Sequence, residues 1–116
     1  MEKENLIKDK SLAFAIRIVK LYKLLCERKE YVLSKQLLRS GTAIGALIRE
    51  SEHAQSKADF INKLSIALKE ANETEYWLIL LMKTDYLNEA EYSSIMVDCK
   101  EVLKLLISII KTIKEK

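Results

Sequence analysis

Glu50 and His53 are the one pair of residues in this chain with the spacing of a metal-binding motif. They form a Glu-x-x-His pair, which di-iron helical bundles use to direct two ligands toward one metal centre. Such a site needs a second pair of this kind and two further glutamates, whereas the chain contains 1 histidine in total. A helical projection also places His53 on the polar side of its helix. The sequence therefore predicts neither a metal site nor a bound cofactor.

Both glycines of the chain lie in the stretch SGTAIGALIRESEH, residues 40–53. Glycines in a turn that opens a helix can cradle a phosphate, usually with a lysine close behind. Here the apolar periodicity continues through Gly41 and Gly45 without a break. Two glycines four residues apart remove side-chain bulk from one strip of a helix, so another backbone can approach closely. We therefore predict close helix packing at Gly41 and Gly45, against a neighbour that the sequence does not identify.

Cys26 and Cys99 are the candidates for nucleophilic chemistry. A cysteine nucleophile needs a base within hydrogen-bond reach. Both cysteines fall on apolar helical stripes and His53 falls on a polar face, so no such pair is indicated. We interpret the cysteines as buried free thiols in a reducing compartment. The acidic cluster within residues 70–75 is typical of a solvated helix face with ion-pair partners. The sequence predicts no catalytic residues and no enzyme.

The elements that hold these residues are predicted to be helices of a single domain. The chain has 116 residues, 2 glycines and no proline, so it contains almost no helix breakers. With 49% hydrophobic and 32% charged residues it has a globular composition. Its N-terminal residues contain no apolar run for export, and no apolar stretch reaches the roughly 20 residues that cross a bilayer. We expect a cytoplasmic protein without a membrane partner.

Apolar residues recur at three- and four-residue spacing in four segments. Ser56 with Asp59, and Asn88 with Glu91, predict side-chain caps at the starts of the third and fourth segments. Four amphipathic helices joined by short turns form an up-down-up-down antiparallel four-helix bundle, so the predicted fold class is all-α. The predicted helices of this domain, residues 1–116, span residues 5–28, 31–54, 57–84 and 89–114.

The third predicted helix has more apolar surface than its core stripe requires. Ile66, Trp77 and Leu80 project away from the stripe that contains Phe60 and Leu64. An exposed tryptophan with aliphatic neighbours is typical of a subunit interface. The alternative is that a broad bundle interior covers these side chains. We interpret the three residues as an oligomer interface.

A row of basic residues follows the polar side of the second predicted helix. Lys35, Arg39, Arg49 and, when protonated, His53 fall on this side over about five helical turns, where they could follow a nucleic-acid backbone. The alternative is an ordinary solvated surface, and the net charge of +3 is modest. In a ring of subunits the row would repeat and form a basic track. Oligomerisation therefore supports nucleic-acid binding.

The stretches KQLLRSGTAIGALIRES (35–51) and ADFINKLSIALKEANETEYWLILL (58–81) resemble the 23S ribosomal RNA intervening-sequence protein family of bacteria. The resemblance extends over nearly the whole chain. It implies an antiparallel bundle, typically assembled as a ring of five, with no catalytic activity; relatives are encoded within insertions in ribosomal RNA genes. A more distant likeness is to the accessory protein of diversity-generating retroelements, a pentameric basic barrel that binds nucleic acid and a reverse transcriptase.

By matching motif, the resemblance assigns roles to two groups of residues. The implied nucleic-acid contacts are Lys35, Arg39 and Arg49, and the implied ring contacts are Ile66, Trp77 and Leu80.

The chain departs from the family pattern at two places. Leu47 stands where an Asn usually follows the Gly-Ala pair, and the proline near the first turn is missing.

Two functional hypotheses follow from the sequence. In the first, the chain is a non-enzymatic helical protein that forms a homopentameric ring and binds RNA or DNA through basic surface stripes. Its partners are then further copies of itself, nucleic acid and, within a retroelement, a reverse transcriptase. In the second, it is a protein–protein adaptor or scaffold without a nucleic-acid role.

Overall fold

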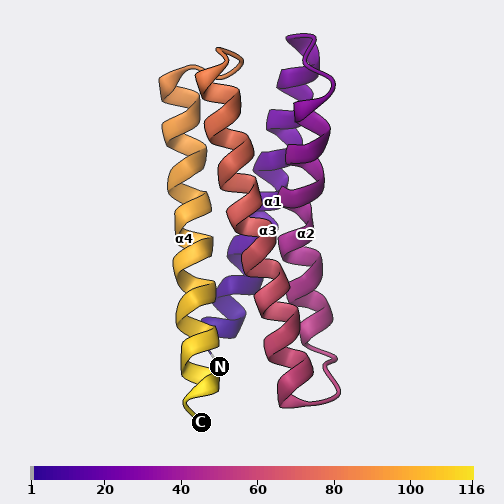
Figure 1. Cartoon of the computed structure of the whole chain (residues 1–116), viewed down its shortest axis with the longest axis vertical. Coiled ribbons are helices and arrows are strands. Elements are labelled where there is room, and N and C mark those ends of the chain that lie inside the picture. Colours follow the sequence, from indigo (N-terminus) through magenta and orange to yellow (C-terminus); the bar gives the residue numbers. More distant parts are fainter. Residues whose placement is uncertain (1) are drawn as a thin grey trace.

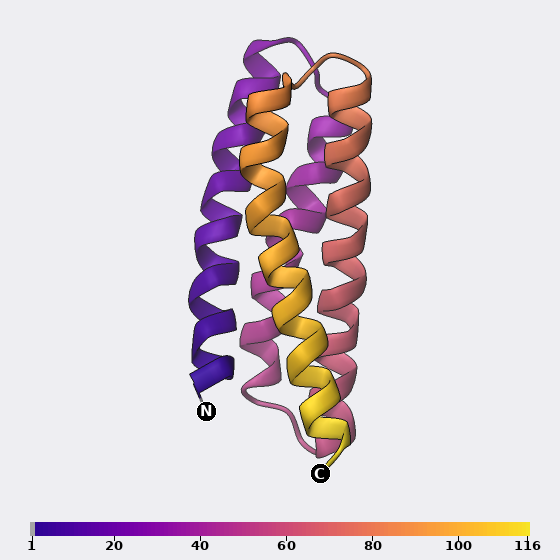
Figure 2. The same ribbon diagram turned by 90° about the vertical axis from the view of Figure 1, so that its left-hand side faces the viewer.

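Four helices joined by short loops account for most of residues 2–116, which the computed structural model describes (Figures 1 and 2). Each helix packs against its two neighbours in the cycle α1–α2–α3–α4, and the bundle measures 46 × 21 × 19 Å. The described residues contain no strand, so the all-α four-helix prediction is confirmed. The helices are α1 (Glu2–Glu27), α2 (Leu33–Ser51), α3 (Lys57–Lys83) and α4 (Glu89–Lys114).

The helices run alternately up and down the bundle. As Figures 1 and 2 show, α1 begins and α4 ends at the same end of the bundle, which also holds the α2–α3 loop. The α1–α2 and α3–α4 loops lie together at the opposite end. None of the helices within residues 2–116 combines the length and the hydropathy that a membrane crossing requires.

The caps predicted for α3 and α4 are present. The Ser56 hydroxyl accepts a hydrogen bond from the Asp59 backbone N–H at 3.0 Å. At α4, the Asn88 side chain accepts from the Glu91 N–H at 2.8 Å, and the Glu91 carboxylate accepts from the Asn88 N–H at 3.0 Å. Each such cap stabilises a helix by about 1 kcal/mol, because it satisfies backbone N–H groups that have no partner within the helix. These caps explain why both helices begin at the predicted residues.

The start of α2 is set by a cap that the sequence analysis missed. The buried carboxylate of Glu30 accepts hydrogen bonds from the backbone N–H groups of Val32, Leu33 and Ser34, and the Ser34 hydroxyl donates back to the Glu30 carbonyl. Lys29 turns the chain with a φ of 65°. Burial raises the pKa of Glu30, but the three N–H donors outweigh it and hold the pKa below its usual value. Glu30 therefore places the first residue of α2 at Leu33 rather than at 31.

The other end of α2 also differs from the prediction. The helix ends at Ser51 rather than at residue 54. The prediction that His53 lies on the polar face of this helix is therefore wrong, because His53 is an exposed residue of the α2–α3 loop. Apolar periodicity did not locate this end, since neither a glycine nor a proline follows α2.

The apolar core runs along the length of the bundle and, within residues 2–116, contains two buried hydrogen bonds between helices. In one, the Cys99 thiol of α4 donates to the Ala71 carbonyl of α3 at 3.8 Å. In the other, the Thr74 hydroxyl of α3 donates to the Ser40 hydroxyl of α2 at 2.9 Å, so the polar groups of both residues are satisfied. The largest fully buried side chains are Ile7, Phe14, Ile18, Leu25, Leu37, Ile44, Leu64, Leu78, Leu81, Leu87, Leu106 and Ile109.

Candidate functional site

Gly41 and Gly45 lie where α2 packs against α1 of the same chain. A β-carbon added to Gly41 would lie 2.8 Å from two carbons of Ile18, closer than atoms can approach without a shift. A β-carbon on Gly45 would lie 3.5 Å from the Ser11 carbonyl oxygen, which is an ordinary contact. Both glycines lie within a continuous helix, as the uninterrupted apolar periodicity predicted. The strip serves helix contact within one subunit, and only Gly41 requires the absence of a side chain.

The basic row on α2 is divided by an ion-pair network. The Arg39 guanidinium lies 3.3 Å from a carboxylate oxygen of Glu70 and 2.6 Å from one of Glu73, both on α3. The pKa of Glu73 is lowered, chiefly by the hydrogen bond from Arg39. Lys35 and Arg49 are exposed, and no carboxylate of residues 2–116 lies within ion-pair distance of either. Two charges of the row are therefore available to a ligand, and a third is already neutralised.

The structure separates the Glu50–His53 pair. Glu50 stays on α2, where its carboxylate lies 3.5 Å from the Lys63 ammonium of α3, whereas His53 follows the end of the helix. The two side chains therefore do not share a helix face. Across residues 2–116, no group of three or more His, Cys, Asp or Glu side chains is arranged to hold a metal ion.

The apolar patch predicted on α3 is only partly exposed. Ile66 is exposed, while Trp77 and Leu80 are half-buried. Trp77 packs against the core, and its indole N–H donates to the Glu73 carboxylate at 3.3 Å. Its ring also contacts Tyr76 edge to face, at 5.1 Å between ring centres. The polar group of Trp77 is thus satisfied within the subunit, and Ile66 is the most exposed of the three predicted interface residues.

A second apolar stripe lies on α1 and was not assigned from the sequence. Leu12, Ile16 and Val19 recur at helical spacing and are 36–49% exposed. Beside them, α2 presents the short side chains around Gly45 and Ala46, which leave a hollow of about 200 Å³ between the helices. The sequence signal was a second row of apolar residues next to the core row. Packing alone shows that this row faces outward.

The α4 helix carries exposed lysines that sequence reasoning also missed. They are spaced three, four or seven residues apart, so they lie on one face of the helix. Because this spacing resembles any solvated helix face, it was not a functional signal by itself. The lysines are Lys100, Lys104, Lys111 and Lys114.

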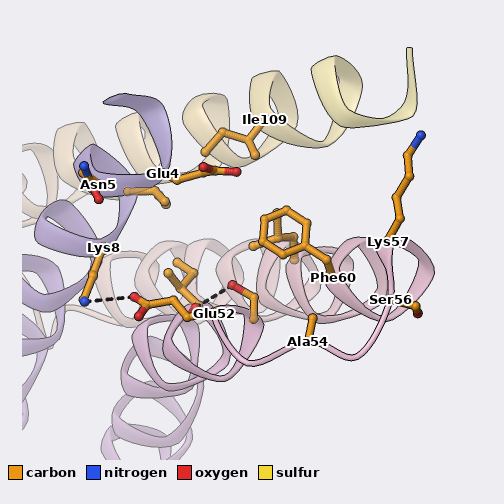
Figure 3. A pocket seen from close by; sticks show the side chains of 13 residues that line it. Glu4, Asn5, Lys8, Glu52, Ala54, Ser56, Lys57, Phe60 and Ile109 are labelled. Atoms are coloured by element: carbon orange, nitrogen blue, oxygen red, sulfur yellow. Dashed lines mark hydrogen bonds and ion pairs between the residues drawn. The ribbon is translucent and has the colours of Figure 1, made fainter. Parts of the chain in front are cut away.

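A hollow of about 540 Å³ lies at the end of the bundle near the α2–α3 loop. Figure 3 shows the Phe60 ring and Ile109 at its apolar floor, and the ion pair between Lys8 and Glu52 on its rim. That ion pair measures 2.9 Å, and the hydrogen bond from Lys8 lowers the pKa of Glu52. None of the residues predicted as contacts lines this hollow.

Both cysteines are free thiols. Cys99 is buried, and burial raises its pKa to about 12. A thiol with so high a pKa is a poor nucleophile, because the thiolate is the reactive form. Cys26 is half-buried, so the expectation that both thiols are buried is wrong for Cys26.

Comparisons with known proteins agree with the architecture. Residues 3–108 match the model of the 23S rRNA-intervening sequence protein family. A crystal structure of a protein with unknown function from the S23 ribosomal protein family of Bacteroides thetaiotaomicron is 68% identical to the chain, with a TM-score of 0.93 over 94% of this chain and 98% of that one. The search of curated proteins gave no match. Because the family model covers nearly the whole sequence, the chain belongs to the 23S rRNA-intervening sequence protein family.

Proposed function

We propose that the chain is a non-enzymatic protein that assembles with further copies of itself into a ring of five and binds RNA or DNA through its basic surface. The proposal rests on the exposure of Lys35 and Arg49 and on the absence, among residues 2–116, of a carboxylate within ion-pair distance of either. Both side chains are exposed on α2 and have no carboxylate within 4 Å in the described part of the chain, although the pKa of nearby Glu52 is lowered by the hydrogen bond from Lys8 and also by the charge of Arg49. Their charges are therefore available to phosphate groups, and binding would release the counterions of those phosphates.

Self-assembly is supported by the exposed apolar side chains of α1. A contiguous stripe such as Leu12, Ile16 and Val19 is typical of a surface that another protein covers. One subunit offers only two unpaired charges in the α2 row. Five copies of this row on one ring would multiply the number of phosphate contacts, which raises affinity without a larger net charge per chain.

The test is nucleic-acid binding at low salt by a variant in which Lys35 and Arg49 are both replaced by Glu. We expect binding to labelled RNA or DNA to fall at least tenfold, with the helical circular dichroism spectrum unchanged. The matched control replaces the exposed α3 residues Lys69 and Lys83 by Glu, which changes the net charge by the same amount. Absence of any mobility shift with micromolar wild-type protein would contradict the proposal.

Arg39 provides a second comparison within the same row. Because Arg39 is already paired with Glu70 and Glu73, we expect Arg39→Gln to weaken nucleic-acid binding less than Arg49→Gln does. A larger loss with Arg39→Gln would mean that the ion pairs open on binding.

A protein–protein adaptor is the second candidate function, and the α1 stripe is the observation that favours it. In that case the stripe binds another protein rather than a second copy. Co-purification of one defined protein in stoichiometric amount, resistant to nuclease and lost in Ile16→Glu, would support the adaptor. A wild-type protein that is monomeric and binds no nucleic acid would also favour it.

A further inference from the structure

The outward face of α4 carries four exposed lysines, with acidic Glu89 at the start of the helix and Glu115 just after its end. Lys100, Lys104, Lys111 and Lys114 are exposed along it, and we call them the α4 lysine row. At a rise of about 1.5 Å per residue, the row extends over about 21 Å. Val97 and Ile107 are the large apolar residues on this face, and both are more than half exposed.

The α4 lysine row has no carboxylate partner, a state that it shares with other exposed lysines of the bundle such as Lys20, Lys69 and Lys83. None of its four ammonium groups has an ion-pair partner among residues 2–116. The cations paired with carboxylates within 4 Å are Lys8, Lys10, Arg17, Arg28, Arg39 and Lys63.

Two acidic residues of α4 that neighbour the row are paired with another helix. Asp98 and Glu101 lie on the side of α4 that faces α1, where Asp98 lies 2.6 Å from Arg17 and Glu101 lies 2.8 Å from Lys10. The two carboxylates that neighbour Lys100 and Lys104 are thus bound to another helix, whereas Glu115, next to Lys114, is exposed and forms no ion pair with the row. The outer face has more unpaired cations than the α2 row.

We infer that the α4 lysine row binds the phosphate backbone of a nucleic acid. The inference rests on the proposed nucleic-acid function and assigns its principal contact to α4, with Lys35 and Arg49 on α2 in a lesser role. Four ammonium groups spread over about 21 Å can each contact one phosphate of a nucleic-acid backbone. Flexible ammonium groups act as point charges, so the binding is independent of base sequence.

Two other occupants fit this face less well. If two copies met through it, the lysine rows would face each other and repel, so a subunit contact belongs elsewhere, such as on the α1 stripe. A membrane-surface helix needs a broad apolar face to enter the lipid boundary, whereas this face offers Val97 and Ile107 as isolated large apolar residues. Its unpaired charge is the property that a phosphate backbone uses.

The experiment compares two triple variants by fluorescence anisotropy with labelled 20-base-pair RNA and DNA duplexes at several salt concentrations. The test variant changes Lys100, Lys104 and Lys111 to Gln. The control changes Lys20, Lys69 and Lys83, which are exposed and lie on α1 and α3. Each variant loses three charges, so the net charge falls from +3 to 0 in both. Each set includes one lysine from the last turn of a helix, Lys111 or Lys83.

For the test variant we expect the affinity at 0.1 M salt to fall by about two orders of magnitude. The slope of log K against log salt for DNA should decrease by about 2.7, or about 0.9 for each lost phosphate contact. The control should lose no more than about tenfold, because only the general field of the protein changes.

The outcomes separate this inference from the proposed function. If the wild-type protein binds neither duplex, both are overturned. If the wild-type protein binds and the two triple variants weaken equally, the assignment to α4 is overturned while the nucleic-acid function stands. Vesicles of phosphatidylserine and phosphatidylcholine form a further arm: binding to them that needs the α4 lysine row, without nucleic-acid binding, would identify a membrane surface instead.

Discussion

At the scale of single residues, the two glycines of α2 have unequal roles. They are four residues apart and face the same helix, but a β-carbon has no space at Gly41 and has space at Gly45. The atoms that crowd Gly41 belong to Ile18 close to its backbone, so they cannot rotate away freely. Sequence spacing treats the two positions alike, and only the packing of α1 on α2 distinguishes them.

Gly41→Ala should destabilise the protein and Gly45→Ala should stabilise it. Replacing a helical Gly by Ala stabilises the helix by about 1 kcal/mol through helix propensity. At Gly45 no steric cost offsets this gain. At Gly41 the overpacking against Ile18 costs about 1–3 kcal/mol, so we expect a net loss. Urea unfolding followed by circular dichroism measures both changes. Equal stabilisation by the two substitutions would show that α1 moves away from α2 without cost.

At the scale of elements, one end of the bundle is tied together by Arg28. This residue follows α1, and its guanidinium donates to the Tyr86 carbonyl at 2.7 Å and to both carboxylate oxygens of Glu91, at 2.8 and 2.7 Å. The Glu91 carboxylate also completes the cap of α4. A single carboxylate thus joins the end of α1 to the start of α4.

The contribution of Glu91 should depend on pH. The hydrogen bond from Arg28, followed by that from the Asn88 N–H, lowers the pKa of Glu91 from 4.5 to about 2. Since the pKa is lower in the folded state, the stabilisation is complete above about pH 4.5 and is lost as the pH falls toward 2. Glu91→Gln should therefore cost about 1–2 kcal/mol at neutral pH and progressively less below pH 4.5.

Denaturant unfolding between pH 7 and pH 2.5 tests this prediction. The matched control is Glu89→Gln, which removes an exposed carboxylate from the same first turn of α4. The control should change stability by a few tenths of a kcal/mol. If the difference in unfolding free energy between wild type and Glu91→Gln stays constant as the pH falls, the ionised Glu91 carboxylate is not the source of the stabilisation.

At the scale of the whole molecule, three surfaces have separate properties. The α1 stripe is apolar, the α2–α3 face contains a network of ion pairs, and the outer face of α4 is basic. Subunit contact suits the apolar surface, and a polyanion suits the basic one. Under the proposed function, a subunit contact on the α1 stripe would leave the basic face of α4 open to nucleic acid.

Ile16→Glu should reduce the size of the assembly measured by light scattering. Ile16 is among the most exposed apolar residues of α1, so a charge there opposes burial in a subunit contact without disturbing the core. Ile66→Glu probes the α3 patch in the same way. Trp77→Glu is a poorer probe, because Trp77 packs on the core and its loss combines unfolding with dissociation. Val97→Glu on α4 is the control, and an unchanged size for both Ile variants would exclude both surfaces.

Local sequence patterns were sufficient for the fold. Apolar spacing predicted four helices, and Ser56 and Asn88 predicted two of their starts, because a cap forms between residues three apart in the chain. The hydrogen bonds to Glu30 were missed, because Glu30 lies two residues before the N-cap Val32 and its role depends on the left-handed turn at Lys29.

The sequence by itself determined that there are four helices and which apolar residues form the core, since a period of 3.6 residues depends only on local geometry. It did not locate the ends of α2, so it placed His53 on a helix face although His53 lies in a loop. Only the tertiary structure decided which charges remain available. Arg39 is paired because α2 is rotated toward Glu70 and Glu73 of α3, and Asp98 and Glu101, which neighbour Lys100 and Lys104, are paired with cations of α1 instead. Helical periodicity contains no information on which neighbouring helix a face will contact. That contact determines which charged side chains are paired, and so determines the candidate sites.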